Sequence, residues 1–353
     1  MDLKKLITRY KQFGGAKLVC QYAKLGVLWP AVKAGLRCLL RRQSFKGIYP
    51  EVLRKTEPYL MERYAHVLRS KMSDVRGKTL EHEHPKVIWW CWLQGIEAAP
   101  PIVRACYNSL VLGEWFIVNG YKFNVIDAEN WKEYIELPDF IVKKWEKKQI
   151  PSALFSDLLR LELLIKYGGT WIDSTVLCTG VNKNHNDNEN TKDSKLATDS
   201  KLSTLNSQLK HKIQEFLEAD LFLFQYTKQG SIPVSISNWF ISAHSNDEVL
   251  IVLRDMLYAY WKDFDCVLDY YVFHLFFAMI SKEYPEQITA MPYGQSQNSL
   301  VLLHHWGETF DQKKWDKLTS KVCFHKLAFR LEKTITENPD NYYSKIIKEY
   351  GNI

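Results

Sequence analysis

The spacing of hydrophobic residues changes several times along the chain, and each change predicts a new element. Residues 86–95 form a short apolar and aromatic run, which is typical of a buried strand, and residues 99–110 predict a helix that starts with proline. Residues 120–130 alternate between apolar and polar, residues 152–169 predict an apolar helix closed by two glycines, and residues 170–177 predict a third strand. This alternation predicts an α/β fold with a mixed, mostly parallel Rossmann-like sheet flanked by helices, which binds ligands at its carboxyl edge.

The second half of the chain begins with a polar segment. Residues 172–215 contain no aromatic side chain, and the part at about 181–209 is rich in Asn, Lys, Ser and Asp, which predicts a mobile loop. An inert insertion and a lid over the substrate both remain open for it. Two further strands and two further helices are predicted beyond it, at residues 221–227, 234–243, 247–264 and 269–284.

The first 46 residues form a basic, amphipathic leader. They hold eleven lysines and arginines against one aspartate, whereas the whole chain has a formal charge of only +7. Apolar residues recur there at helical spacing, with an interruption at Pro30, and no run is long enough to span a membrane or resembles a signal peptide. We expect a helical segment that lies in the membrane surface, and an ordinary helix packed on the core is the alternative. The body is slightly acidic, which argues against nucleic acid as a partner.

Four segments follow from these patterns. The leader spans residues 1–46, and a helical connector with Thr56 as a candidate N-cap spans 47–83. The α/β domain spans 84–330, and a helical tail spans 331–353. With 46% hydrophobic residues the chain can bury a core, and its seven scattered cysteines without a CxxC pair indicate reduced thiols in the cytoplasm.

The most informative stretch runs from Ala153 to Thr175. Asp157 and Arg160 lie three residues apart, hence on one face of the predicted helix. The glycine pair then turns the chain into the strand that carries Asp173 to the sheet edge. Carboxylates and a guanidinium suit the hydroxyls of a sugar nucleotide, and a carboxylate can hold a divalent metal against its diphosphate. An exposed ion pair is the alternative for Asp157 and Arg160.

This stretch resembles the motif of glycosyltransferase family 32, the sugar-binding DxD type, and in particular its capsular polysaccharide synthesis branch. The matching residues are Ser156, Asp157, Arg160, Gly168, Gly169, Asp173 and Thr175. Weaker similarity extends from Pro85 to Leu327. The resemblance implies a GT-A fold and a retaining hexosyltransferase that uses a nucleotide-sugar donor, with UDP as the expected nucleotide.

The resemblance also implies roles for single residues. Asp173 matches the first Asp of DxD, as a catalytic residue and metal ligand, and Asp269 matches an acidic residue beside the reacting centre. The implied donor-binding residues are Trp92, Asp157, Arg160, Ser174, Thr175, Asn238 and Lys326. Trp92 is expected to stack on the base, although it could belong to the core like Trp89 and Trp90. Asp269 could instead be a carboxylate at a helix start.

The motif departs from the family pattern at Thr175, where the second Asp of DxD would stand. Loss of one carboxylate predicts a lower affinity for a divalent metal, which the resemblance still implies as cofactor. His325, in a segment similar to the family's HKL element, is the implied third metal ligand, after Asp173 and the hydroxyl of Thr175, and His304 and His305 are alternatives. An imidazole ligand favours Mn²⁺ over Mg²⁺.

These expectations combine into one function. The chain is expected to transfer a sugar from a nucleotide donor to a lipid-linked glycan in capsular or surface polysaccharide synthesis, at the inner face of the cell membrane. No catalytic base is expected, since the departing phosphate oxygen can take the acceptor proton. Two alternatives are a non-catalytic relative that binds nucleotide sugars or carbohydrate, and a phosphotransferase that uses a nucleotide-linked polyol.

Overall fold

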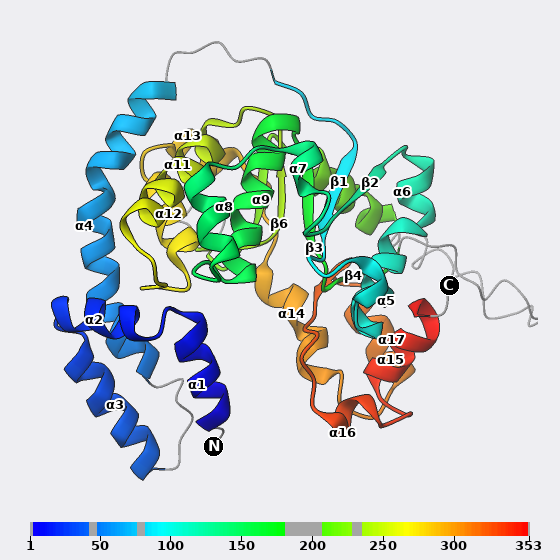
Figure 1. Cartoon of the computed structure of the whole chain (residues 1–353). Coiled ribbons are helices and arrows are strands. Elements are labelled where there is room, and N and C mark those ends of the chain that lie inside the picture. Colours follow the sequence, from blue (N-terminus) through cyan, green and yellow to red (C-terminus); the bar gives the residue numbers. More distant parts are fainter. Residues whose placement is uncertain (1–2, 42–47, 76–81, 181–206, 228–234, 352–353) are drawn as a thin grey trace, which may run out of the picture. The chain divides into compact units, whose positions relative to one another are not determined.

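The computed structural model describes residues 3–41, 48–75, 82–180, 207–227 and 235–351 (Figure 1). The chain divides into two compact units. The first combines residues 1–81, 135–165 and 246–285, and the second combines residues 82–134, 166–245 and 286–353. The polar loop predicted at about 181–209 lies outside the described residues, except for its end, which belongs to a helix at 207–217.

The first unit is helical. It contains α1 (Leu3–Gln12), α2 (Ala16–Lys24), α3 (Leu28–Leu40), α4 (Tyr49–Val75), α8 (Asp139–Glu146), most of α9 (Ser152–Tyr167), α11 (Glu248–Asp263) and α12 (Val272–Ile280). Helix α11 packs against both α4 and α12, which gives this unit its core. Helices α1 to α3 confirm that the predicted leader is helical, and they belong to the same compact unit as α4.

Two details of the predicted leader and connector are wrong. Thr56 is not an N-cap, because α4 begins at Tyr49 and the buried Thr56 hydroxyl donates to the carbonyl of Val52 inside the helix, at 3.2 Å. The chain breaks before Pro30, at Gly26, which has a φ of 63°. Pro30 lies in the first turn of α3, where its missing N–H removes no helical hydrogen bond.

The second unit is built on a five-stranded sheet. Its strands are β1 (Val87–Cys91), β2 (Lys122–Ile126), β3 (Gly169–Asp173), β5 (Leu221–Gln225) and β6 (Ile236–Ala243), in the order β2-β1-β3-β6-β5. β1 runs parallel to β2 and β3, and β6 runs antiparallel to β3 and β5. Only β6 therefore opposes the other strands, which confirms the predicted mixed, mostly parallel sheet.

The strand predicted at residues 170–177 is two strands. β3 ends at Asp173, a turn follows, and β4 (Val176–Cys178) pairs antiparallel with β7 (Phe324–Lys326) in a separate small sheet. The apolar run continues across the turn because both strands are buried. Their periodicity alone therefore does not reveal the break.

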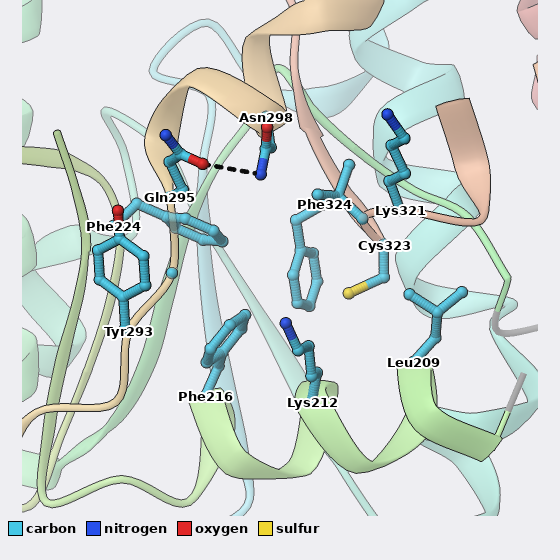
Figure 2. Close-up of a pocket in the computed structure, with 12 residues that line it drawn as sticks. Leu209, Lys212, Phe216, Phe224, Tyr293, Gln295, Asn298, Lys321, Cys323 and Phe324 are labelled. Carbon is cyan, nitrogen blue, oxygen red and sulfur yellow. Dashed lines mark hydrogen bonds between the residues drawn. The ribbon is translucent and has the colours of Figure 1, made fainter. Parts of the chain in front are cut away.

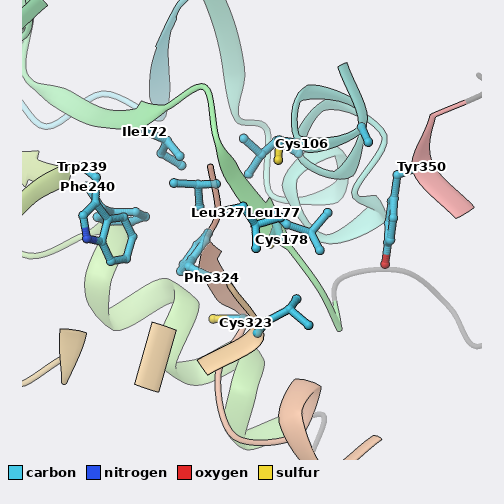
Figure 3. Close-up of a cluster of buried hydrophobic side chains, with 14 of the residues drawn as sticks. Cys106, Ile172, Leu177, Cys178, Trp239, Phe240, Cys323, Phe324, Leu327 and Tyr350 are labelled. Carbon is cyan, nitrogen blue, oxygen red and sulfur yellow. The ribbon is translucent and has the colours of Figure 1, made fainter. Parts of the chain in front are cut away.

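Besides the helix at 207–217 and the end of α9, this unit contains further helices. They are α5 (Pro101–Val111), α6 (Glu114–Val118), α7 (Trp131–Tyr134), α13 (Pro285–Ala290), α14 (Ser296–His305), α15 (Gln312–Thr319), α16 (Lys333–Thr336), α17 (Tyr342–Tyr350) and the 3-10 turn η2 (Ile96–Ala98). α5 packs on β4, α17 on α5, and α14 on β7. A shared hydrophobic core joins the two sheets, with Ile172, Phe240 and Phe324 fully or almost fully buried at its centre (Figure 3). This core fixes β7 against the turn that follows β3.

The glycine pair between α9 and β3 has a steric reason. Gly168 and Gly169 have φ values of 70° and 91°. A Cβ on Gly168 would lie 2.5 Å from the carbonyl oxygen of Glu83, and one on Gly169 would lie 2.6 Å from that of Val87. Only glycine both adopts these positive φ values without strain and leaves room for the two carbonyl oxygens. The predicted sharp entry into β3 is confirmed.

Candidate active site

Several predicted residues meet at the carboxyl edge of the five-stranded sheet. Cys91 of β1 pairs with Asp173 of β3, so Trp92 and Ser174 follow directly at the ends of neighbouring parallel strands. On β6, Phe240 pairs with Ile172, and Asn238 therefore lies beyond the end of β3. Ligands bind at this edge in open α/β sheets. The sheet thus gathers these four predicted residues at one edge.

Two side chains hold the carboxylate of Asp173. The indole Nε1 of Trp171 donates to Oδ1 at 2.9 Å, and the ammonium Nζ of Lys326 donates to Oδ2 at 2.9 Å. Trp171 lies two residues before Asp173 and hence on the same face of β3. Its role was not predicted from the sequence, although this spacing could have indicated it. Both ends of the carboxylate are therefore oriented by this unit's own residues.

Lys326 also binds the residue that replaces the second Asp. Its Nζ donates to Oγ1 of Thr175 at 2.5 Å. The pairing of Val176 with Lys326 and the 2.8 Å hydrogen bond from the amide of Leu327 to the carbonyl of Thr175 fix this position. The structure thus joins three predicted residues in one cluster of Asp173, Thr175 and Lys326, which we call the lysine cluster. The side chains of Lys326 and Asp173 keep 21% and 24% exposure, so a ligand can reach them.

The structure gives His325 a different environment. Neighbouring residues of a strand point to opposite faces, and the buried His325 forms a 2.9 Å hydrogen bond through Nε2 with Oγ1 of Thr179. Burial lowers its pKa to about 4. Within the described ranges, no three His, Cys, Asp or Glu side chains gather in a way that could hold a metal ion. The lysine cluster does not fit a divalent cation, because an ammonium occupies its one carboxylate. The manganese dependence that the resemblance implies stays a prediction.

The low pKa of His325 predicts acid sensitivity. The unfolded chain takes up a proton near pH 6.5 and the folded chain only near pH 4, so protonation favours unfolding between these values. Between pH 7 and pH 5 this group should lower the free energy of unfolding by about 2 kcal/mol. We expect His325→Gln to remove most of this fall in urea titrations at the two pH values. His304→Gln, at an exposed position, should leave it unchanged; an undiminished fall in His325→Gln would contradict the prediction.

Asp157 and Arg160 form an ion pair in the helical unit. Arg160 Nη2 lies 3.4 Å from Asp157 Oδ1, and the side chains are only 5% and 8% exposed. Arg160 also donates to the carbonyl and hydroxyl oxygens of Ser156, both at 3.2 Å. The alternative of an exposed pair on a helix surface is therefore wrong. Burial and the charge of Arg160 lower the pKa of the neighbouring His274 to about 4.

Asp269, the third predicted residue of this unit, is also buried. Its Oδ1 accepts a hydrogen bond from the amide of Tyr271 at 2.7 Å and so shapes the turn before α12. Its charge contributes, together with burial, to raised pKa values of Tyr22 and Glu57. Asp269 thus lies among residues of the leader and of α4, and a part in catalysis stays a prediction.

The three tryptophans in and directly after β1 differ in burial, and Trp92 also packs against the hydrophobic core, so both alternatives for it remain open. Trp89 is buried and donates through Nε1 to the carbonyl of Gly168 at 2.9 Å, and Trp90 is fully buried. Trp92 is only partly buried, and its ring meets that of Phe329 edge to face at 5.1 Å. Phe329, which is 38% exposed, is a second aromatic ring at this edge that the sequence did not indicate.

The alternative histidine ligands have other surroundings. His304 is exposed near the end of α14. His305 pairs through Nδ1 with Glu308 at 2.8 Å and lies 3.0 Å from Lys314 Nζ. Neither contact involves the lysine cluster.

A separate cavity of about 120 Å³ lies between the 207–217 helix, β5 and the start of β7 (Figure 2). Phe216, Phe224 and Phe324 form its apolar wall, and Lys212 and Lys321 line its polar side. None of the predicted site residues lines it. The predicted site thus lies outside this cavity.

Comparison with known proteins identifies the family to which the sequence is similar. A family model described as capsular polysaccharide synthesis protein matches residues 39–346. Among curated proteins, none matches the sequence. Among solved structures, the chain is similar to PaToxG Glycosyltransferase, with a TM-score of 0.35 and 11% sequence identity, over 75% of this chain and 93% of that one. At this TM-score the structural likeness supports no argument about activity.

Proposed function

The chain belongs to the family of capsular polysaccharide synthesis proteins, and from this we propose that it is a retaining glycosyltransferase that transfers a sugar from a nucleotide donor, with UDP expected, to a lipid-linked glycan. The observation that carries the proposal is the lysine cluster at the carboxyl edge of the sheet, beside Trp92. Such an edge combines a cation for phosphate, a carboxylate for sugar hydroxyls and an aromatic ring for a base.

The proposed reaction needs few groups of the protein. The bond between the anomeric carbon and the β-phosphate oxygen breaks, and a bond from the acceptor oxygen to the same carbon forms on the same face of the sugar. The acceptor proton passes to the departing phosphate oxygen, and Lys326 stabilises the negative charge that develops there. Asp173 orients Lys326 and accepts a hydrogen bond from the donor sugar.

The remaining predicted residues are proposed to bind the donor. Trp92 and Phe329 offer two rings for the base, and Ser174 and Asn238 offer short polar side chains at the end of β3. Asp157 and Arg160 are proposed to bind ribose and sugar hydroxyls.

A screen of donors tests the proposal. Purified protein is incubated with a panel of UDP- and GDP-sugars, and the released nucleotide is measured with and without Mn²⁺. We expect release from one donor or a few donors of the same nucleotide. A non-catalytic relative, the alternative favoured by Thr175 at the second Asp position, would bind a donor without turning it over. A nucleotide-linked polyol in the same panel tests the phosphotransferase alternative.

We also propose that α3 holds the enzyme on the inner face of the cell membrane. Trp29, Val32, Leu36 and Leu40 recur three or four residues apart and are all exposed, with Leu40 at 84% and Trp29 at 65%. The buried residues Ala34 and Cys38 lie on the opposite face of the helix. Within the described part of the chain, no helix is long and apolar enough to cross a bilayer.

The charge beside this apolar stripe indicates which surface it would meet. Lys33, Arg37 and Arg41 are exposed at the same helical spacing, one residue along from the stripe. An apolar face bordered by basic residues suits the surface of an anionic membrane, where the apolar side chains enter the acyl boundary and the cations meet lipid phosphates.

We expect the double variant Leu36→Glu and Leu40→Glu to lose at least about 100-fold in binding to vesicles that contain anionic lipid, since each leucine buried in the membrane contributes about 1.5–3 kcal/mol. Cosedimentation measures the loss, and release of nucleotide in solution should not change. The control, Leu112→Glu and Val118→Glu, adds the same charges at exposed apolar positions outside the leader. Equal vesicle binding by the two double variants would rule out α3 as the contact.

A further inference from the structure

In the lysine cluster, the ammonium of Lys326 binds the side chains of Asp173 and Thr175, which a divalent metal would otherwise bind. We infer that the Lys326 ammonium takes the place of the metal ion, so that this chain binds the donor diphosphate without a divalent cation. The inference rests on the proposed function and specifies how that site holds its substrate.

The charges of the cluster support the inference. Asp173 supplies one negative charge and Lys326 one positive charge at 2.9 Å, and Thr175 adds none. A cation that approached the same carboxylate would meet an ammonium already bound to it, and two cations that share one carboxylate repel each other. Mn²⁺ and Mg²⁺ need hard oxygen ligands, and the cluster leaves them one shared carboxylate and one hydroxyl that already accepts a hydrogen bond.

The position of the ammonium is fixed by the backbone. Pairing of β4 with β7 sets Lys326 opposite Val176, directly after Thr175. The same pairing turns His325 to the other face, where it binds Thr179. The lysine is thus presented to Asp173 by a strand that belongs to the same core and does not depend on a flexible loop.

The ammonium of Lys326 has one proton left for a further ligand. An ammonium has three protons, and two of them bind Asp173 and Thr175. Among the described residues the third has no acceptor in the protein. With its side chain 21% exposed, Lys326 can offer this proton to a phosphate oxygen of the donor without breaking either contact.

Two readouts on purified protein test the inference. Binding of UDP, or of GDP if the donor screen selects it, is measured by calorimetry in EDTA and in Mn²⁺. Binding of Mn²⁺ to the nucleotide-free protein is measured by electron paramagnetic resonance. We expect the nucleotide Kd in the two buffers to agree within about twofold. Without nucleotide, the protein should cause no stoichiometric loss of the signal of free Mn²⁺.

Substitutions distinguish a phosphate contact made by Lys326 from one made by a bound metal ion. Lys326→Met keeps the apolar stem and should weaken nucleotide binding about 10- to 100-fold, because a charge-assisted hydrogen bond is lost. Mn²⁺ should not restore it. The double variant Thr175→Asp and Lys326→Met has two carboxylates and no ammonium, and it should bind Mn²⁺ and recover nucleotide affinity only when Mn²⁺ is present. Unfolding midpoints verify that each variant is folded.

The opposite results have distinct meanings. The inference is wrong if Mn²⁺ raises the nucleotide affinity of the wild type more than 10-fold, or if Lys326→Met keeps the wild-type affinity. Either result leaves the glycosyltransferase proposal unaffected. Absence of nucleotide binding in both buffers overturns the proposed function and the inference with it.

Discussion

Replacement of Asp173 by asparagine is expected to reduce sugar transfer at least about 100-fold, the largest effect of any single substitution proposed for this chain. Asparagine keeps the shape of the side chain but removes the charge that orients Lys326, which lies 2.9 Å away. Without it the ammonium is free to turn from the phosphate, and the contact with the donor sugar weakens. Nucleotide release from the donor selected by the screen measures the effect.

A neighbouring carboxylate serves as the control. Asp127 follows β2 at the same edge of the sheet and accepts backbone hydrogen bonds from Glu129 and Asn130, at 2.8 and 2.9 Å. Asp127→Asn should therefore affect the turn, with a small loss of stability, and leave transfer near the wild-type rate. A loss of transfer as large as that of Asp173→Asn would show that any charge at this edge matters and would remove the special role of Asp173.

The second large effect is expected at the buried ion pair in α9. Arg160→Met removes a cation 3.4 Å from Asp157, whose side chain is only 8% exposed, and should lower the free energy of unfolding by about 3–5 kcal/mol. The double variant Asp157→Leu and Arg160→Met replaces the pair by apolar side chains and should recover most of that stability, but transfer should remain almost absent. Urea unfolding and nucleotide release are measured on the same samples.

These two measurements separate a structural role of the pair from a functional one. If the double variant regains transfer together with stability, the pair only supports the helix, and its assignment to the donor is wrong. Arg254→Met is the control. Arg254, on α11, lies 3.6 Å from Glu162, which is on α9 like Asp157. This substitution should lower stability while transfer persists.

Local patterns in the sequence were sufficient for the element that carries the motif. Helix α9 starts at Ser152 and ends before the glycine pair as predicted, because an apolar helical period and a positive-φ stop are both properties of a short stretch. The five-stranded sheet followed in the same way from alternating strands and helices.

Features that depend on distant partners could not be predicted. The break after Asp173 exists because β4 leaves the sheet to pair with β7, almost 150 residues later, as in Leu177 with His325. The same register decides that Lys326 and not His325 faces Asp173. The two residues are adjacent, and either could take this position until the strand partner is known. The burial of the Asp157 pair likewise depends on helices that the motif does not include.

The central claim is that this chain moves a sugar from a nucleotide to a lipid-linked acceptor at the site of Asp173. The direct measurement incubates the enzyme with acceptor-containing membranes and a donor labelled in its sugar, and then counts label in the extracted lipid. We predict label in the lipid fraction with the wild type and only background with Asp173→Asn. Label that stays on intact nucleotide sugar, bound to the wild-type protein but never transferred, would contradict the account and identify a binding protein instead.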